Sequence, residues 1–196
     1  MTTQLQAFLD NLSSDWEPLK IQAIKYADSD SIIREDGAAQ FYRRPWIAPE
    51  NFGFLIFPPA NIPMIEKFEK SHSLPNIYKN AMLQVNGCFI YDFYLFGLPR
   101  SMYSTNLLDR SFLQQLDLGI ANSSWIHEYE VSQDLFHIGG RSYSDNENCG
   151  YFIAKDNKIL SFRKNGQEIN TWTSLKSFLE TELNLAEEIM ISERSA

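Results

Sequence analysis

Between residues 62 and 87, the order of apolar and polar positions predicts two short helices joined by a tight break. Ile62, Ile65 and Phe68 recur at a helical spacing, which places them on one apolar face. The second helix is predicted from four apolar residues at i, i+3, i+4 and i+7, namely Tyr78, Ala81, Met82 and Val85.

The ends of these helices are marked by residues suited to capping. Asn61 is the predicted N-cap of the first helix and Ser73 that of the second. Pro63 and Pro75 then fall in the first turns, where a missing N–H costs little. Gly87, after Asn86, ends the pair because glycine accepts the left-handed backbone conformation.

After Gly87 the pattern becomes extended. Residues 88–96 (CFIYDFYLF) predict a single nine-residue central strand, and residues 101–124 predict a helical insert. Four short strands follow, at 135–138, 151–154, 159–163 and 168–172. The predicted turns between them are Gly139-Gly140, Asp156-Asn157 and Asn165-Gly166. A last helix begins after Thr173 or Ser174, with four residues facing inward: Leu175, Phe178, Leu179 and Leu183.

The first part of the chain gives weaker signals. Leu5, Phe8, Leu9 and Leu12 share a helical face, while residues 41–42 and 54–57 suit short strands. We therefore expect one α+β domain, an antiparallel β-meander packed with helices. Its predicted parts are an N-terminal extension packed on the main domain (1–56), the main domain (57–184) and an acidic C-terminal tail that frays (185–196).

Composition narrows the class of protein. A chain of 196 residues with 44% hydrophobic content can bury a sufficient core without a disulfide or metal. Its two cysteines, Cys88 and Cys149, are expected to be reduced thiols of a cytoplasmic protein. We expect no signal peptide and no membrane span, because the start lacks a basic and apolar leader and no apolar run approaches about 18 residues. A net charge of −8 disfavours direct nucleic-acid binding and suits a basic partner protein.

Candidate chemistry is sparse. His72, His127 and His137 match no metal or catalytic motif, and His137 is expected to be a buried strand residue. The polar loop 142–148 lacks the spacing of an EF-hand, so we interpret it as a solvated loop. Arg43-Arg44 beside Trp46 could clamp a phosphate or carboxylate, but a solvated turn is favoured in so acidic a chain. The sequence predicts no cofactor, no metal and no catalytic residue.

The distribution of charge along the chain indicates more about function than any sequence motif does. Eight acidic and three basic side chains lie between Cys88 and Cys149, so −5 of the net −8 falls there. The acids could simply be scattered over a soluble surface. Interleaved tyrosines instead favour a partner interface, because tyrosine is common at binding hot spots and opposite charge speeds encounter. The predicted partner-binding residues are Tyr91, Asp92, Tyr94, Tyr143, Asp145 and Glu147.

Several of these segments together resemble the SUKH superfamily. The first half of the resemblance consists of Pro58-Pro59-Ala60, Ile65-Glu66, Phe68-Glu69, Leu74-Pro75, Tyr78 and Asn86-Gly87. The second half consists of Gly150–Ile153, Asp156-Asn157, Ile159, Ser174-Leu175 and Phe178-Leu179. The resemblance covers residues 57–184, and the chain departs from it between Tyr91 and Asp134, which is extended here.

The resemblance implies an α+β fold without enzymatic activity. SUKH proteins are mostly bacterial immunity proteins that bind and neutralise a cognate toxin, often a nuclease, and fungal relatives act in cell-wall regulation. The first hypothesis is therefore an immunity protein that occludes the active site of a toxin with a basic surface. The alternative is a regulatory scaffold or adaptor for a host signalling or cell-wall partner. The resemblance implies structural roles for Glu66, Leu74, Pro75, Tyr78, Asn86, Gly87 and Gly150.

Overall fold

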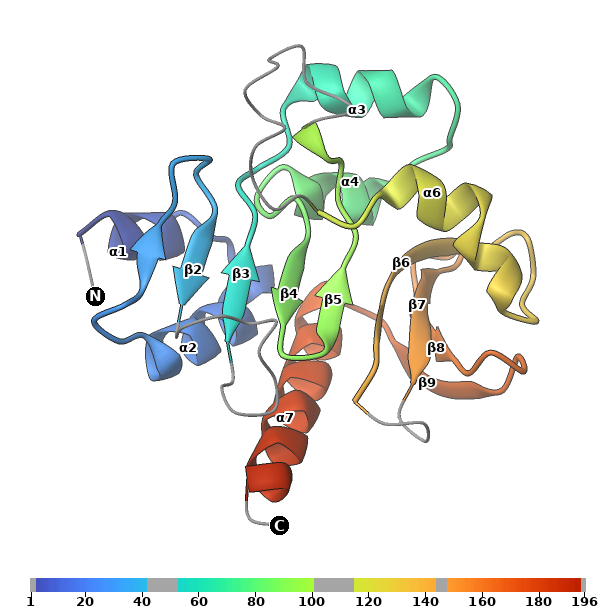
Figure 1. Cartoon of the computed structure of the whole chain (residues 1–196). Coiled ribbons are helices and arrows are strands. Elements are labelled where there is room, and N and C mark those ends of the chain that lie inside the picture. Colours follow the sequence, from blue (N-terminus) through green and yellow to red (C-terminus); the bar gives the residue numbers. More distant parts are fainter. Residues whose placement is uncertain (1–2, 42–52, 101–114, 144–147, 195–196) are drawn as a thin grey trace.

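The computed structural model describes residues 3–41, 53–100, 115–143 and 148–194. It shows an α+β fold with one nine-stranded antiparallel sheet and helices packed against it (Figure 1). The strands lie in the sheet in their order along the chain, so each pairs with its neighbours in sequence. The predicted α+β class and antiparallel meander are confirmed. The strands are β1 (Ile32–Ile33), β2 (Ala39–Phe41), β3 (Phe54–Ile56), β4 (Cys88–Ile90), β5 (Phe93–Leu95), β6 (Phe136–Arg141), β7 (Cys149–Ile153), β8 (Ile159–Phe162) and β9 (Glu168–Trp172).

The first 57 residues contribute to the same sheet and core as the rest. They contain α1 (Thr3–Asp10), a 3-10 turn η1 (Ser14–Trp16), α2 (Glu17–Tyr26) and the first three strands. β3 pairs with β4 across the inserted helices, with Leu55 opposite Phe89. Leu5 and Leu9 of α1 are fully buried, as the helical pattern predicted. The residues assigned to an extension therefore share one hydrophobic core with the main domain.

The predicted helix pair is present as α3 (Ile62–Glu69) and α4 (Asn76–Met82). The Asn61 side chain accepts a hydrogen bond from the Met64 amide at 3.0 Å, which confirms the predicted cap. Ser73 is not the cap of α4, because the Tyr78 amide bonds to the Pro75 carbonyl and the helix begins there. Ile62 also departs from the prediction. It is 50% exposed at the first helical position, outside the face that Ile65 and Phe68 bury.

The predicted nine-residue strand over residues 88–96 is wrong. The chain reverses at Tyr91 and Asp92, so that β4 and β5 form a tight hairpin with Ile90 opposite Phe93. Tyr91 has a φ of 52°, in the left-handed region. Because both strands are largely buried, the run shows no polar alternation, and Asp92 is the one polar residue that marks the reversal.

Gly139-Gly140 is not a turn but part of β6. A Cβ at Gly139 would lie 2.2 Å from the Tyr94 carbonyl oxygen, so the close approach of β5 requires glycine there. The register of β6 against β7 also shifts between His137 and Gly139. The turns predicted at Asn157 and Gly166 are confirmed, with φ values of 65° and 75°.

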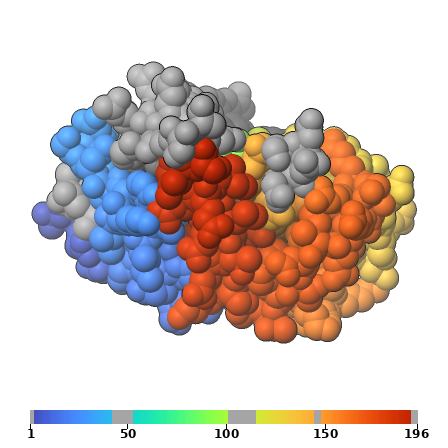
Figure 2. Space-filling model, turned by 90° about the horizontal axis from the view of Figure 1, so that it is seen from below, coloured from blue at the N-terminus to red at the C-terminus, as the bar shows by residue number. Residues whose placement is uncertain are grey.

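The last helix, α7 (Leu175–Arg194), is longer than predicted. Ser174 accepts a hydrogen bond from the Ser177 amide at 3.1 Å, as expected of its cap. The tail does not fray after Ala186, because Ala186 and Met190 are buried and Glu187 bonds to α2. Figure 2 shows the blue N-terminal segment and the red α7 side by side, in agreement with the packing of α2 on α7.

Part of the predicted helical insert is present as α6 (Leu118–Ser123), and a 3-10 turn, η3 (Trp125–Glu128), follows it. Asp117 caps α6 by accepting hydrogen bonds from the Gly119 and Ile120 amides. Residues 101–114 of the predicted insert lie outside the described residues, as do Arg43, Arg44 and Trp46. α6 and η3 lie beside β6, to which α6 is packed (Figure 1).

Candidate functional site

Four of the six predicted partner-binding residues are described, and they lie in the β4–β5 hairpin and just after β6. Tyr91 and Tyr143 are 5% and 6% exposed, and their rings stack with centroids 5.5 Å apart. Their faces are therefore occupied by each other within the chain. Asp92 and Tyr94 are half-buried beside them. Asp145 and Glu147 lie outside the described residues.

Beneath this pair lies a buried ionic cluster that ties the sheet to α7. Glu182, which is fully buried, accepts hydrogen bonds from the guanidinium of Arg141 and from the hydroxyl of Tyr151. Burial is the first reason that the pKa of Tyr151 lies well above its ordinary value, and the nearby charge of Glu182 adds to it. The Tyr151 phenol thus stays neutral and acts as a donor.

Two polar residues of the SUKH-like pattern make specific backbone contacts. The Tyr78 hydroxyl donates to the carbonyls of Phe96 at 2.6 Å and Ile138 at 3.1 Å. The buried Asn86 amide accepts from the Leu98 N–H at 2.8 Å and donates to the Leu98 carbonyl at 3.0 Å. These contacts attach α4 and the strand that follows it to the segment after β5.

The remaining residues of the SUKH-like pattern are two glycines and three other side chains. Gly87 has a φ of 88°, as expected of its left-handed conformation. Gly150 lies in β7, where an added Cβ would come within 3.0 Å of Phe152, Tyr129 and His137. Three other residues of the pattern differ in exposure: Leu74 is buried, Pro75 is half-buried and Glu66 is exposed.

His137 is buried, as predicted for a strand residue. Its ring stacks on Phe152 with centroids 4.5 Å apart, and Phe96 and Tyr129 meet it edge to face at 4.9 and 5.2 Å. Nε2 lies 3.0 Å from the Gly139 carbonyl, which fixes the proton of the neutral ring on that nitrogen. Burial lowers the pKa of His137 to about 4. The imidazole is therefore neutral at physiological pH.

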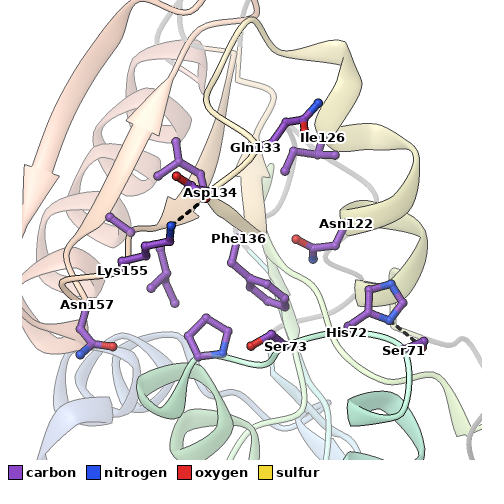
Figure 3. A pocket seen from close by; sticks show the side chains of 14 residues that line it. Ser71, His72, Ser73, Asn122, Ile126, Gln133, Asp134, Phe136, Lys155 and Asn157 are labelled. Carbon is purple, nitrogen blue, oxygen red and sulfur yellow. Dashed lines mark hydrogen bonds and ion pairs between the residues drawn. The ribbon is translucent and has the colours of Figure 1, made fainter.

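A hollow of the described surface lies where three loops meet (Figure 3). It has a volume of about 520 Å³. Its walls are the α3–α4 loop at residues 71–75, the η3–β6 segment at 133–136 and the β7–β8 turn at 153–157. Residues from three distant parts of the sequence thus form one cleft.

The floor and rim of this cleft differ in chemistry. Phe136 projects into the centre of the cleft in Figure 3. Its ring lies edge to face with that of Phe68, with ring centroids 6.4 Å apart. The rim is polar and exposed, with Ser73, Gln133 and Asn157 around it. On one side Lys155 pairs with Asp134 at 2.8 Å, and this ion pair is largely exposed. An apolar floor with a hydrogen-bonding rim is suited to hold one apolar side chain and the polar backbone beside it.

A second hollow of about 450 Å³ adjoins the first. The two share Asn122, Ile126 and Gln133, so that the α6–η3 segment lines both of them. We call the pair the η3 groove. Its further lining includes His127 and Tyr129.

Sequence reasoning did not find the η3 groove. Pro75 belongs to the SUKH-like pattern and Ser73 precedes that part of it, but nothing in the sequence links them to Gln133 or Lys155. The four residues lie on loops that only the sheet brings together.

Comparison of the chain with protein-family models, with curated proteins and with solved structures finds no match. Among the described residues, no helix is long and apolar enough to cross a membrane. Within the same residues, no three His, Cys, Asp or Glu side chains are grouped so as to hold a metal ion. Cys88 and Cys149 are both buried, and burial raises the pKa of Cys88 to about 12.

Proposed function

We propose that this chain is a SUKH-like immunity protein that binds a cognate toxin and neutralises it by covering its active site. The observation that carries the proposal is the η3 groove, in which an apolar floor around Phe136 is bordered by exposed polar side chains. A loop of the toxin would place an apolar side chain on that floor. Gln133 and Ser73 would then bond to the loop backbone.

Two further properties support a protein partner. The first is the resemblance itself, because Ser73 and Pro75 of the SUKH-like segment form part of the groove wall. The second is charge. A chain with a net charge of −8 and a pI near 4.9 attracts a basic protein at long range, which raises the association rate at low salt. The bound acidic chain would also repel the anionic substrate of a nuclease-type toxin.

The proposal is tested by co-expressing the chain with the product of the neighbouring gene. We expect a one-to-one complex in size-exclusion chromatography, loss of the partner's toxicity, and an affinity that falls as salt is raised. A stable complex without any protection would favour the scaffold or adaptor function instead. Absence of both a complex and protection would refute the immunity function for that partner.

The groove is tested with a matched pair of variants. Gln133→Arg puts a long charged side chain on the groove rim, while Gln4→Arg makes the same change on the exposed face of α1, remote from the groove. The proposal predicts that Gln133→Arg weakens toxin binding at least about 10-fold, a difference of about 1.4 kcal/mol. Gln4→Arg should leave the affinity unchanged. Equal affinities would place the interface elsewhere.

A further inference from the structure

The α6–η3 segment, which forms one wall of the η3 groove, is attached to the sheet through His137. The Asn122 side chain on α6 accepts a hydrogen bond from the His137 amide at 2.8 Å and donates to the His137 carbonyl at 2.8 Å. Asn122 also donates to the Leu118 carbonyl at 2.9 Å, within its own helix. Any movement of the His137 residue is therefore passed directly to α6.

The imidazole of the same residue is enclosed by this wall. Tyr129, immediately after η3, covers it from one side, and Phe152 of β7 stacks on it from another. Nδ1 is buried and makes no hydrogen bond among the described residues, although the Ala121 carbonyl of α6 lies where it partly favours the protonated ring. A second proton would therefore create a buried cation enclosed by aromatic rings, which is costly unless the ring reaches water.

The wall is weakly held compared with the sheet. All four residues of η3 are half-buried or exposed. Trp125 rests on Phe96 with ring centroids 5.4 Å apart, and Glu128 pairs with Lys164 in an exposed ion pair. Exposed ion pairs contribute little to stability. Within the wall, α6 is anchored by the buried Leu118 and Ala121, whereas η3 buries little surface. Opening therefore begins at η3 and needs a lower free energy than unfolding of the whole domain.

We propose that protonation of His137 favours opening of the α6–η3 wall, so that an open form of the η3 groove, which cannot hold the partner, becomes more populated in mildly acidic conditions. The effect on the partner rests on the proposed function, whereas the opening of the wall does not.

The charges around His137 fix the direction of this switch. Burial lowers its pKa most, while the carbonyls of Gly139 and Ala121 and the charge of Glu128 oppose that shift in part. Tyr129, which faces it after η3, and Tyr94 on β5, which lies near Tyr129, have raised pKa values because they are buried, so both stay neutral. From β7, Cys149 lies near these tyrosines.

The size of the effect follows from proton linkage. The folded pKa is about 4, and an exposed histidine titrates near about 6.5. Because the open wall binds the proton more tightly, its population rises as pH falls through this window. Between pH 7 and pH 5 the opening equilibrium should increase about 20-fold.

Hydrogen exchange of the free chain tests the opening. The probes are α6–η3 amides hydrogen-bonded within the segment, those of Ala121, Ser124 and Tyr129. After correction for the intrinsic exchange rate, their protection should fall about 20-fold from pH 7 to pH 5. It should stay below the protection of the β7 core amides at both values. His137→Phe keeps an aromatic ring but cannot titrate, so the fall should disappear.

Three results would overturn the inference: unchanged protection in the native chain, an equal fall in His137→Phe, or α6–η3 protection identical to that of β7 at both pH values. The last would indicate global unfolding. His137→Gln, also non-titrating, gives the same test if the Phe variant does not fold. The effect on the partner is tested separately, by measuring toxin affinity at the same pH values. If protection is lost at low pH but no toxin binds at any pH, the proposed function is refuted, whereas the opening of the wall is still supported.

Discussion

The side chain of Asn122 bonds to the backbone of His137 as a neighbouring β-strand would. It occupies both the N–H and the carbonyl of His137, each at 2.8 Å, at the end of β6 beyond its pairing with β5. One amide thus satisfies a stretch of sheet edge that would otherwise need water or another strand. It also fixes α6 and the wall of the η3 groove to the sheet.

Asn122→Ala should therefore destabilise the domain by about 2 kcal/mol, because two backbone groups of β6 lose their partner. Asn122→Asp keeps the acceptor for the His137 amide but loses the donor to the His137 carbonyl, so this variant should also be destabilised. Urea denaturation followed by circular dichroism measures both. A change below about 0.5 kcal/mol in Asn122→Ala would show that water replaces the amide without cost.

Asn86 should be more costly to replace. Its side chain is 1% exposed and makes two hydrogen bonds to Leu98. Asn86→Ala leaves both groups of Leu98 buried without partners, which should lower the free energy of unfolding by about 3 kcal/mol. Asn80→Ala is the control, since Asn80 is exposed on the neighbouring helix α4. The control should stay within about 0.5 kcal/mol of the native chain. Equal losses in the two variants would contradict the assignment.

Gly150→Ala should disturb the aromatic cluster around His137. A Cβ there would lie 2.8 Å from both Phe152 and Tyr129, so at least one ring has to move. We expect a loss of about 2 kcal/mol and a changed near-ultraviolet circular dichroism signal. Adding Tyr129→Leu removes one of the clashing rings, and part of the loss should then be recovered. If the double variant is no more stable than Gly150→Ala, the clash with Tyr129 is not the cause.

Glu187 should stabilise the contact between α7 and α2 in a pH-dependent way. Burial alone would raise its pKa, but hydrogen bonds from Lys25, Tyr26 and Gln22 outweigh that effect and the pKa is lowered. A lowered carboxyl pKa contributes stability above the ordinary value near 4.5, and this contribution is lost as pH falls through the folded pKa.

Glu187→Gln should accordingly destabilise the domain at pH 7 by about 1 kcal/mol, a modest value because Lys25 is 55% exposed. The difference from the native chain should shrink as the pH falls below the ordinary value near 4.5 and through the folded pKa, because the native carboxylate then becomes protonated as well. Urea denaturation at a series of pH values from 7 downward measures it. A difference that stays constant over the series would mean that the ionised form of Glu187 is not favoured by folding.

Much of the fold could be predicted because local signals agreed with the tertiary structure. The caps at Asn61 and Ser174, the turns at Asn157 and Gly166 and the inward faces of α4 and α7 all depend on neighbours within a few residues. The α+β class then followed from the order of helices and strands.

The errors arose where long-range contacts outweigh local pattern. The run at 88–96 is buried in both strands of a hairpin, so hydrophobicity did not reveal the reversal at Tyr91. Gly139 is needed for the approach of β5, a contact that no local signal contains. The length of α7 depends on Glu187 meeting α2.

The candidate site was less predictable than the fold. The sequence places Tyr91 and Tyr143 among acidic residues, which suits a partner interface, but the sheet brings them together in a buried stack. The η3 groove depends on three loops separated by up to about eighty residues, whose meeting follows only from the strand order. Pattern and composition describe neighbours in sequence, whereas a surface groove is made by neighbours in space.

Calorimetric titration of the purified product of the neighbouring gene into this chain tests the central claim most directly. The account predicts one-to-one binding that weakens with salt, at least about 10-fold weaker binding to Gln133→Arg, and native affinity for Gln4→Arg. Identical affinities for the two variants, or no heat of binding with a partner whose toxicity the chain suppresses, would contradict neutralisation through the η3 groove.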